Sequence, residues 1–390
     1  MAQIISQKVT AKQLLQYIPE EEFAGLIKET GVDYQVKKLY GKNLFYLLLY
    51  GLLETTRVSH RSLEDVFKSK KFKLLFKLTD QKNFKYNSIS ERLSNINAEF
   101  FEKIYYSTYE RFSQMFNEHD ASVYNIARVD STMVCEAANK IEAGMTVGKK
   151  KDGKKQVKYT ICLTDLFPSS VEVFTQQSAL SEDLTIPKLI LKNIDKKDDN
   201  IFAFDRGVHS RAKFCEFTEN GILFVTRVNP DARHETLEIQ KIPKNLKVGN
   251  LDILSYEKVY LKKDRKNIEV FFRLLKTKNE NDEPIWFLTN GLGLSIKQVI
   301  YVYKRRWDIE VFFRFIKQEL NFSHFLSTNI NGIKVVLYMT LILAMLILIY
   351  KKINKLGYKT AKRRFYYEVD EIIMRIAIIL SGGNPDLVFR

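Results

Sequence analysis

The 390-residue sequence predicts a layered α/β domain that follows a helical N-terminal segment. From about residue 121, short apolar runs bounded by turn residues alternate with segments of helical spacing, in the order strand, hairpin, helix, strand, helix, strand. That order is typical of a sheet covered by helices. Residues 1–120 instead carry helix-start signals and helically spaced apolar side chains, so we expect a separate helical domain there.

The composition indicates a folded protein with a polyanionic partner. With 45% apolar and 13% aromatic residues, the chain can bury a substantial core, which excludes a disordered protein. The formal net charge is +16 and the pI about 9.4, and this positive excess favours nucleic acid as the partner. A merely soluble basic protein is the alternative.

Cysteine usage and the N-terminus indicate a cytoplasmic protein. Cys135, Cys162 and Cys215 are widely spaced and follow no metal-ligand pattern, so we expect small core residues in a reducing compartment. The first residues lack an apolar stretch long enough for a secretory signal.

Two helix starts are expected in the N-terminal segment. Ser62 with Asp65, and Ser88 with Glu91, each fit the Ser-x-x-acid capping pattern, so helices are predicted to begin just after each serine. Residues 65–77 interleave Lys with Phe and Leu. Such a helix can pack its apolar side while its ammonium groups face phosphates, or it can carry a solvated basic face. The first interpretation predicts a DNA-binding domain.

The region from 121 to 228 supplies the main sheet. Its hairpin is expected to turn near Pro168, and residues 229–292 are predicted to form a β-rich insertion apart from that sheet. We expect strands over 124–129, 157–167, 171–176, 201–204 and 222–228, and helices over 186–194 and 210–219.

Residues 300–320 are predicted to form a single helix with a row of polar side chains. The stretch contains no Gly or Pro, and its apolar residues recur at helical spacing. On a helical wheel, a phenol, a guanidinium, a carboxylate and an ammonium fall within an arc of about 60°. They belong to Tyr303, Arg306, Glu310 and Lys317, with Trp307 and Arg314 at the edge of the arc. Charged rows and i,i+4 ion pairs are also ordinary on surface helices.

Residues 335–350 form a strongly apolar stretch. Its 16 residues fall short of the about 20 needed to cross a bilayer core, so we expect the buried central helix of the α/β domain and no membrane span. Residues 359–380 close the chain as a basic amphipathic helix, and the C-terminal helices are candidate dimerisation surfaces.

Two aspartates follow apolar runs at predicted strand ends. Asp130 comes after Ile-Ala-Arg-Val and Asp205 after Ile-Phe-Ala-Phe. A buried carboxylate is costly unless it is paired or bound to a cation, although a lone Asp there is often a turn residue or helix cap. Together with Glu310 these acids make three oxygen ligands that suit Mg²⁺ or Mn²⁺. The five histidines are scattered, which argues against a zinc site.

These residues carry a resemblance to a known family. Asp130-Ser-Thr, Asp205-Arg-Gly and Tyr303-x₂-Arg306-x₃-Glu310-x₆-Lys317 resemble the DDE transposases of bacterial insertion sequences, in the group with the Tyr-Arg-Glu-Lys (YREK) signature. The resemblance covers residues 121–355 and leaves 356–390 as a helical tail. It implies a ribonuclease H-like catalytic domain with a β-rich insertion at about 229–292.

The resemblance also implies an activity. Asp130, Asp205 and Glu310 would hold two divalent metals, Mg²⁺ or Mn²⁺, in a two-metal phosphoryl-transfer site. The family cuts transposon ends from double-stranded DNA and joins the 3′ ends to a target, and relatives pass through a hairpin intermediate. Tyr303, Arg306 and Lys317 would grip phosphates near the terminal nucleotides, and a homodimer would act on paired terminal inverted repeats.

Aromatic and basic residues extend the predicted DNA interface. The two tryptophans of the chain, Trp307 and Trp286, are candidate stacking platforms for an extruded base, although Trp286 could equally pack within its strand. Arg314 lies beside the signature row. A turn over 148–158 carries six lysines and one aspartate, and either tracks the DNA backbone or is solvated. Its predicted DNA contacts are Lys149, Lys150, Lys151, Lys154 and Lys155.

Three other interpretations stay open. A metal-dependent nuclease on the same fold would lack the strand-joining step, and a non-catalytic derivative would only bind DNA. A membrane protein would be anchored through residues 335–350. The intact set of three carboxylates disfavours the non-catalytic derivative.

Overall fold

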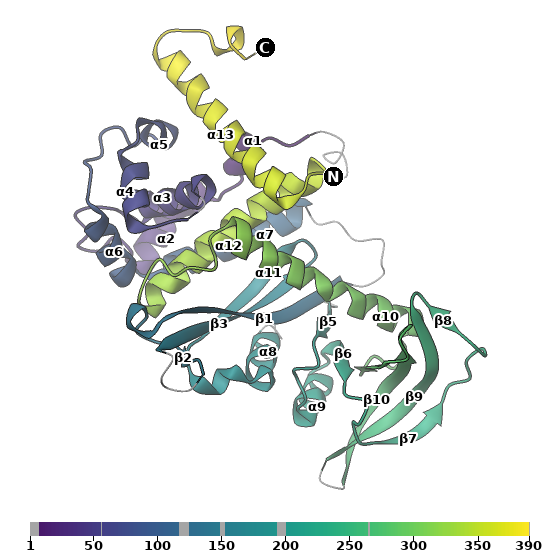
Figure 1. Cartoon of the computed structure of the whole chain (residues 1–390). Coiled ribbons are helices and arrows are strands. Elements are labelled where there is room, and N and C mark those ends of the chain that lie inside the picture. Colours follow the sequence, from purple (N-terminus) through teal and green to yellow (C-terminus); the bar gives the residue numbers. More distant parts are fainter. Residues whose placement is uncertain are drawn as a thin grey trace. The chain divides into compact units, whose positions relative to one another are not determined.

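The computed structural model describes residues 8–55, 57–116, 125–148, 153–192, 200–263 and 266–389. The chain forms two compact units, whose helices and strands are labelled in Figure 1. The helical unit comprises Met1–Asn117, Val134–Gln156 and Arg314–Arg390, and the sheet unit comprises Glu118–Met133 and Val157–Phe313. The domain boundaries predicted at 120 and 355 stay predictions.

The helical unit contains helices from both ends of the chain. The described residues between 8 and 116 form helices and no strand, as their apolar spacing predicts. These helices are α1 (Ala11–Gln16), α2 (Phe23–Thr30), α3 (Gly41–Glu54), α4 (His60–Lys68), α5 (Lys70–Leu75), α6 (Tyr86–Asn95) and α7 (Ala98–Phe116). The C-terminal helices are α12 (Ile330–Ile353) and α13 (Tyr358–Leu380).

Helix α12 is the core of the helical unit. Nearly every side chain from Val335 to Tyr350 is buried, and the helix contacts α3, α6, α7 and α13. Within the described residues it is the one helix long and apolar enough to cross a membrane, and 89% of its most apolar window is buried inside the protein. A helix that is apolar on all sides needs cover all round. Other helices provide this cover, so α12 is buried as expected, and its assignment to the α/β domain stays a prediction.

Two N-terminal helices begin three residues earlier than predicted. Helix α4 starts at His60 because Ser59 caps it: its Oγ accepts from the Ser62 N–H at 3.1 Å, and its own N–H donates to Ser62 Oγ at 2.8 Å. Helix α6 starts at Tyr86. The capping pattern therefore identified the helices but not their first residues.

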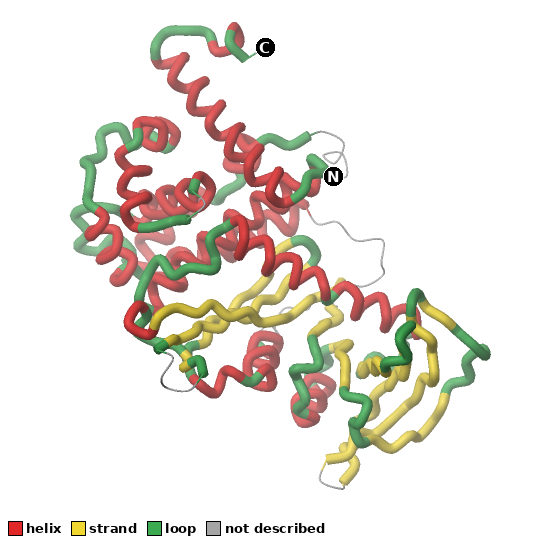
Figure 2. Tube along the Cα trace, viewed as in Figure 1, coloured by secondary structure: helices red, strands yellow, loops and turns green. Residues whose placement is uncertain are grey.

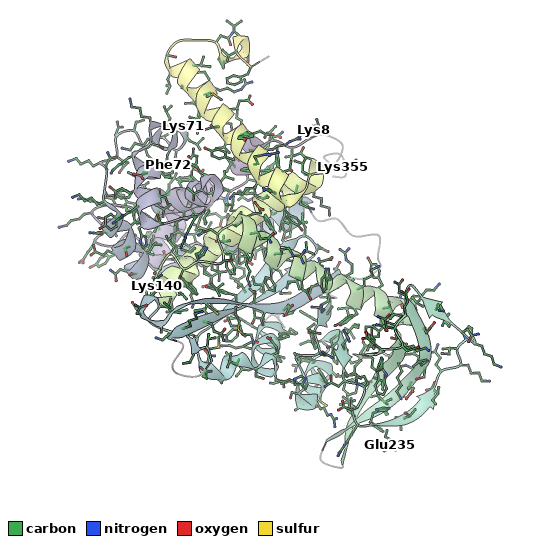
Figure 3. The ribbon with its side chains drawn as sticks, viewed as in Figure 1. Lys8, Lys71, Phe72, Lys140, Glu235 and Lys355 are labelled. Atoms are coloured by element: carbon green, nitrogen blue, oxygen red, sulfur yellow. The ribbon has the colours of Figure 1, made fainter. Side chains whose placement is uncertain are left out.

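Helix α5 shows how the interleaved lysines and aromatic residues separate. Phe72 is fully buried, whereas the adjacent Lys71 Nζ pairs with Asp370 Oδ1 on α13 at 2.9 Å (Figure 3). The apolar side of the basic segment thus packs as expected. The Lys71 ammonium already has a carboxylate partner.

The sheet unit is organised around parallel strands. β1 (Asn125–Ala137) pairs in parallel with β5 (Asn200–Phe204), which pairs in parallel with β6 (Leu223–Val228). β3 (Lys154–Thr164) neighbours β1 and pairs antiparallel with β4 (Phe167–Phe174). The order β4–β3–β1–β5–β6 is that of the ribonuclease H-like sheet that the resemblance implies. The fold class is therefore confirmed as mixed α/β with a large central sheet.

Helices cover both faces of this sheet. α8 (Glu182–Leu191) and α9 (Arg211–Glu219) pack on one face in a core with Val129, Phe204 and Phe224. α10 (Ile296–Arg305) packs on the other face in a core with Ile126 and Val225. The opposite placement of Phe224 and Val225 follows from the two-residue period of a strand. This alternation gives the sheet unit three layers, helix, sheet and helix.

The β-rich segment continues the main sheet, which corrects the prediction that it lies apart. β11 (Pro284–Thr289) pairs antiparallel with β6, so the edge of the parallel strands is extended (yellow in Figure 2). The order then runs β11–β10–β9–β7. These strands are β10 (Lys266–Lys278), β9 (Leu251–Lys263) and β7 (His234–Ile239), with the short β8 (Lys247–Val248) on β9 and β2 (Met145–Thr146) on β3.

Two smaller features also differ from prediction. The β3–β4 hairpin turns at Asp165, whose φ is +50°, while Pro168 already lies within β4. Asp tolerates the left-handed region better than most residues, which places the turn there. Among the cysteines, Cys162 is buried and Cys215 is partly buried, but Cys135 is exposed and so is not a core residue.

Candidate active site

Strand register brings Asp130 and Asp205 to the same edge of the sheet. Arg128 on β1 pairs with Ala203 on β5, so two residues further along Asp130 stands level with Asp205. β5 ends at Phe204, as predicted, but β1 continues past Asp130 to Ala137. The expectation that Asp130 ends its strand was therefore wrong. It stands beyond the part of β1 that pairs with β5, because β5 has already ended.

The helix expected over 300–320 is two helices. α10 ends at Arg305 and α11 spans Trp307–Glu319. Between them the winding tightens: the Arg306 N–H donates to Tyr303 O at 3.0 Å, and the Ile309 N–H donates to Arg306 O at 3.2 Å. These i to i−3 contacts are those of a 3₁₀ turn, which often marks a functional position inside a helix. The interruption falls on the central arginine of the signature.

Arg306 bridges two of the three predicted carboxylates. Its Nη2 donates to Glu310 Oε1 at 2.6 Å, and its Nη1 donates to Asp130 Oδ2 at 3.5 Å. The Tyr303 hydroxyl donates to Asp205 Oδ1 at 3.3 Å. Three acids that are far apart in sequence thus meet around one arginine and one tyrosine. Two members of the predicted polar row, Tyr303 and Arg306, therefore contact the aspartates at the sheet edge.

The site leaves Asp130 incompletely compensated. Burial raises the pKa of Asp130 to about 6, and the charges of Glu182 and Asp205 act in the same direction. The Ser131 N–H, 2.7 Å from Asp130 Oδ1, and the Arg306 charge oppose this rise without cancelling it. Burial is therefore the main reason that the pKa of the Asp130 carboxyl is raised.

Tyr303 keeps its proton in this setting. Burial raises the pKa of Tyr303 to about 12, and the Asp205 charge adds to the rise, against the opposing charges of Arg306 and Arg227. Its ring also packs edge-on against Phe287 at 5.1 Å between centroids. The hydroxyl is thus a fixed hydrogen-bond donor. Arg227, on β6, is a cation of this site that the sequence analysis missed.

The donor set has the chemistry of a divalent-cation site. Asp130, Asp205 and Glu310 supply only carboxylate oxygens, which Mg²⁺ and Mn²⁺ prefer. Arg306 stands between Asp130 and Glu310 and compensates part of their charge. Across the described ranges, no three His, Cys, Asp or Glu side chains are placed to hold a metal ion together. The three residue types fit a divalent cation. In this structure the side chains of Asp130 and Glu310 pair with the Arg306 guanidinium.

A second group of charged residues, missed in the sequence, lies behind Asp130. Lys158 on β3 is fully buried, and its Nζ pairs with Glu182 Oε1 at 2.8 Å and donates to the Ala179 and Leu180 carbonyls at 3.0 and 3.1 Å. Glu182 Oε2 accepts from the Ser131 hydroxyl at 2.9 Å. Lys158 belongs to the lysine-rich stretch but is no solvated side chain. The position of Lys158 between Val157 and Tyr159, at the start of the apolar run of β3, was the signal for it.

Glu182 also explains the glycine of the Asp-Arg-Gly motif. A Cβ atom at Gly207 would lie 2.9 Å from Glu182 Cγ and 3.2 Å from its Cβ. Only a residue without a side chain allows this close approach between the loop after β5 and the start of α8. In the Asp-Arg-Gly motif, Asp205 therefore accepts from the Tyr303 hydroxyl, and Gly207 leaves room for the Glu182 side chain.

The other predicted DNA contacts lie outside this cluster. Arg314 and Lys317 follow on α11 within the helical unit, where Arg314 is exposed and burial lowers the pKa of Lys317. On β3, Lys154 is exposed and Lys155 Nζ donates to the Ile141 and Glu142 carbonyls at 3.3 and 3.0 Å. Lys149, Lys150 and Lys151 lie outside the described residues.

The two tryptophans have different surroundings. Trp307 opens α11 with 54% of its surface exposed, and the Arg306 guanidinium lies 6.0 Å from its ring centroid. Trp286 lies on β11 with Lys276 Nζ 4.9 Å from its ring centroid and the His234 ring edge-on at 5.8 Å. Trp286 thus has protein partners at its ring, while Trp307 presents a large open surface.

The family of this domain is shown by its match to a family model. The family model described as transposase DDE domain matches residues 121–346, and the chain belongs to that family. None of the curated proteins compared with the chain matches it. Among solved structures, the chain is similar to a piggyBac transposase in a synaptic complex with hairpin DNA, with 10% identity and a TM-score of 0.47, over 96% of this chain and 82% of that chain.

Proposed function

We propose that this chain cuts the ends of its own DNA element and joins the freed 3′ ends to a target, as a bacterial insertion-sequence transposase of the Tyr-Arg-Glu-Lys group. Membership of the transposase DDE family supports the reaction class. The observation that carries the proposal is the meeting of the signature residues with the two distant aspartates: Tyr303 bonds to Asp205, and Arg306 to Asp130.

Three residues are proposed to hold the metal ions. Asp130, Asp205 and Glu310 would bind two Mg²⁺ or Mn²⁺ ions, which when bound supply an activated nucleophile and stabilise the leaving oxygen. Arg306 forms ion pairs with two of these carboxylates, Asp130 and Glu310. A cation can take over that role, because it neutralises the same oxygens.

The cationic and aromatic residues of the signature segment would hold DNA. Arg306 has a planar fork that can bind a phosphate bidentately, and Lys317 would act as a point charge on a neighbouring phosphate. Tyr303, held protonated, can donate to a phosphate oxygen. The exposed ring of Trp307 suits stacking on a base extruded during hairpin formation.

The proposed partners are terminal inverted repeats and target DNA, bound by a homodimer on paired ends in the bacterial cytoplasm. The C-terminal part of α13 supports a protein–protein contact, since Ile379 and Leu380 are 59% and 73% exposed. Light scattering of the protein alone and with end DNA would measure the stoichiometry. A monomer under both conditions contradicts the dimer.

The test of the function uses a plasmid that carries the gene with its natural flanks. Purified protein and Mg²⁺ are expected to release the element, with hairpin ends visible on a denaturing gel. A second reaction supplies pre-cut ends and a target plasmid, and joined products are expected. Cleavage without joining would reassign the chain as a nuclease. DNA binding without cleavage would identify a non-catalytic derivative.

A further inference from the structure

An arginine-lined pocket opens beside the candidate active site, in the sheet unit. It has a volume of about 260 Å³ and lies between the loop after β5, the start of α9 and the loop after β6. Four arginines and one histidine line it, and Asp231 is the single carboxylate among the lining residues. The arginines are Arg206, Arg211, Arg227 and Arg233. Arg206 directly follows Asp205, so the pocket begins one residue away from the acidic cluster.

The charge of this pocket is not compensated by the protein. Within the described part of the chain, none of the four arginines forms an ion pair, although arginines elsewhere in the protein commonly do. Arg227 also carries a buried Nε with no hydrogen-bond partner in the described residues. Guanidinium groups gathered at one hollow repel each other, and a bound anion removes that repulsion.

The shape and the donors of the pocket select a phosphate. A guanidinium presents a planar fork of N–H donors that matches phosphate oxygens, and several such forks around one hollow suit a doubly contacted anion. Buried apolar side chains, among them Val208, Phe214 and Leu261, also line the pocket. An apolar wall next to cationic groups is suited to the sugar carbons attached to a phosphate.

We propose that this pocket binds a backbone phosphate of a DNA strand that runs past Asp205, at a position away from the bond that is cut. The inference rests on the proposed function, because a DNA strand must reach the carboxylates. It adds a second anchoring point for the strand, and this point begins at Arg206, one residue along the chain from Asp205.

The test compares two double variants of the full-length protein. Arg211→Ala/Arg233→Ala removes two pocket charges from positions outside the acidic cluster, and Lys241→Ala/Lys244→Ala removes two exposed charges from the loop between β7 and β8 of the same unit. Affinity for a fluorescent nonspecific duplex is measured by anisotropy between about 50 and 200 mM KCl. The pocket variant is expected to bind at least about tenfold more weakly, and its salt slope is expected to be shallower by about 1 to 2.

Further arms separate the possible causes. Arg211→Lys/Arg233→Lys keeps the charge and loses the fork, so it is expected to recover the salt slope but not the full affinity. Thermal unfolding with inorganic pyrophosphate tests the pocket without DNA: stabilisation of the wild type that is lost in the alanine variant supports an anion site. A pyrophosphate effect without any DNA binding would leave a free phosphorylated compound as the ligand and contradict the DNA proposal. Equal behaviour of the two double alanine variants with both probes overturns the inference.

Failure of the proposed function gives a different pattern. Loss of plasmid cleavage with intact, pocket-dependent DNA binding would refute the transposase chemistry alone. Normal cleavage with no effect of the pocket variant on binding would refute the pocket alone.

Discussion

Two carboxylates in the sheet unit, the buried Glu257 and the partly buried Asp130, are surrounded in opposite ways. Glu257 on β9 is 4% exposed, with Lys276 Nζ at 2.9 Å and the Ser255 and Thr236 hydroxyls at 2.5 and 2.7 Å. Burial acts to raise the pKa of Glu257, but these bonds outweigh it and hold the pKa below its usual range. Asp130 has one short bond, from Ser131, and a 3.5 Å contact with Arg306, and burial dominates.

This difference separates a structural acid from one that retains capacity for a cation. Glu257 has its oxygens filled by protein donors, so no partner from outside is needed. Asp130 lies near Glu182 and Asp205, and it shares Arg306 with Glu310. Its negative charge is therefore costly unless a further cation binds. A carboxylate therefore stabilises the β-rich segment at Glu257, whereas the carboxylate of Asp130 retains the capacity to bind a cation.

The largest expected effect comes from removing an acid of the candidate site. Asp130→Ala, Asp205→Ala or Glu310→Ala is expected to reduce Mg²⁺-dependent cleavage by at least about 10³-fold, because each removes a proposed metal ligand. Folding, followed by circular dichroism and thermal unfolding, is expected to stay close to wild type. Substantial cleavage by any one variant would show that the site is misassigned.

Glu257 is expected to behave in the reverse manner. Glu257→Ala leaves the partly buried Lys276 ammonium without its carboxylate, which is expected to cost about 3 kcal/mol of unfolding free energy. Because the pKa of Glu257 is lowered in the folded state, its stabilisation is present above the ordinary carboxyl pKa and is lost as the pH falls through the lowered value. Urea unfolding at pH 7 and at a series of pH values below about 4.5 measures both effects.

Glu257→Gln is the matched control, since it keeps the size of the side chain and removes the titration. It is expected to flatten the acid dependence of stability. DNA cleavage per folded molecule should stay near wild type in both variants. If the unfolding free energy of Glu257→Gln fell with pH as that of the wild type does, Glu257 would not be the acid that stabilises the fold.

The order of elements and the acidic residues were accessible from the sequence because they depend on local patterns. Apolar alternation gives strands such as β5, and the turn after it leaves Asp205 in place. The spacing of Tyr303, Arg306 and Glu310 follows helical geometry, and these side chains do converge on the two aspartates.

What the sequence could not give depends on long-range pairing. Whether β11 joins β6 is decided by contacts between distant segments, and no local pattern distinguishes a separate sheet from an extended one. The interruption at Arg306 and the burial of Lys158 have the same origin. Arg306 pairs with Glu310, which follows it in the sequence, and with Asp130, which lies far before it. Lys158 is buried because Glu182, 24 positions later, pairs with it.

Substitution of Arg306 tests whether this cation only compensates an acid, as Lys276 does for Glu257, or also binds phosphate. Arg306→Ala is expected to lower cleavage by about 10²-fold, because its fork would hold phosphate in the working complex. Unfolding free energy is expected to change by less than about 1 kcal/mol, since the variant relieves the burial of the guanidinium while it loses the bonds to Glu310 and Asp130. Arg306→Lys is expected to recover only part of the rate. An unaltered cleavage rate would place Arg306 with the structural cations.

The smallest effect is expected from the ion pair of Lys158 and Glu182, which lies next to Ser131. Lys158→Met leaves Glu182 without its cation, whereas Lys158→Met/Glu182→Gln removes both charges, so a double-mutant cycle on unfolding is expected to give a coupling of about 1–2 kcal/mol. Glu182 also holds the Ser131 hydroxyl, and the Ser131 N–H binds Asp130. Glu182→Gln is therefore expected to raise the Mg²⁺ concentration needed for half-maximal cleavage a few-fold, with little change in the rate at saturating metal. A loss of stability with an unshifted metal requirement would make this pair purely structural, like the pair at Glu257.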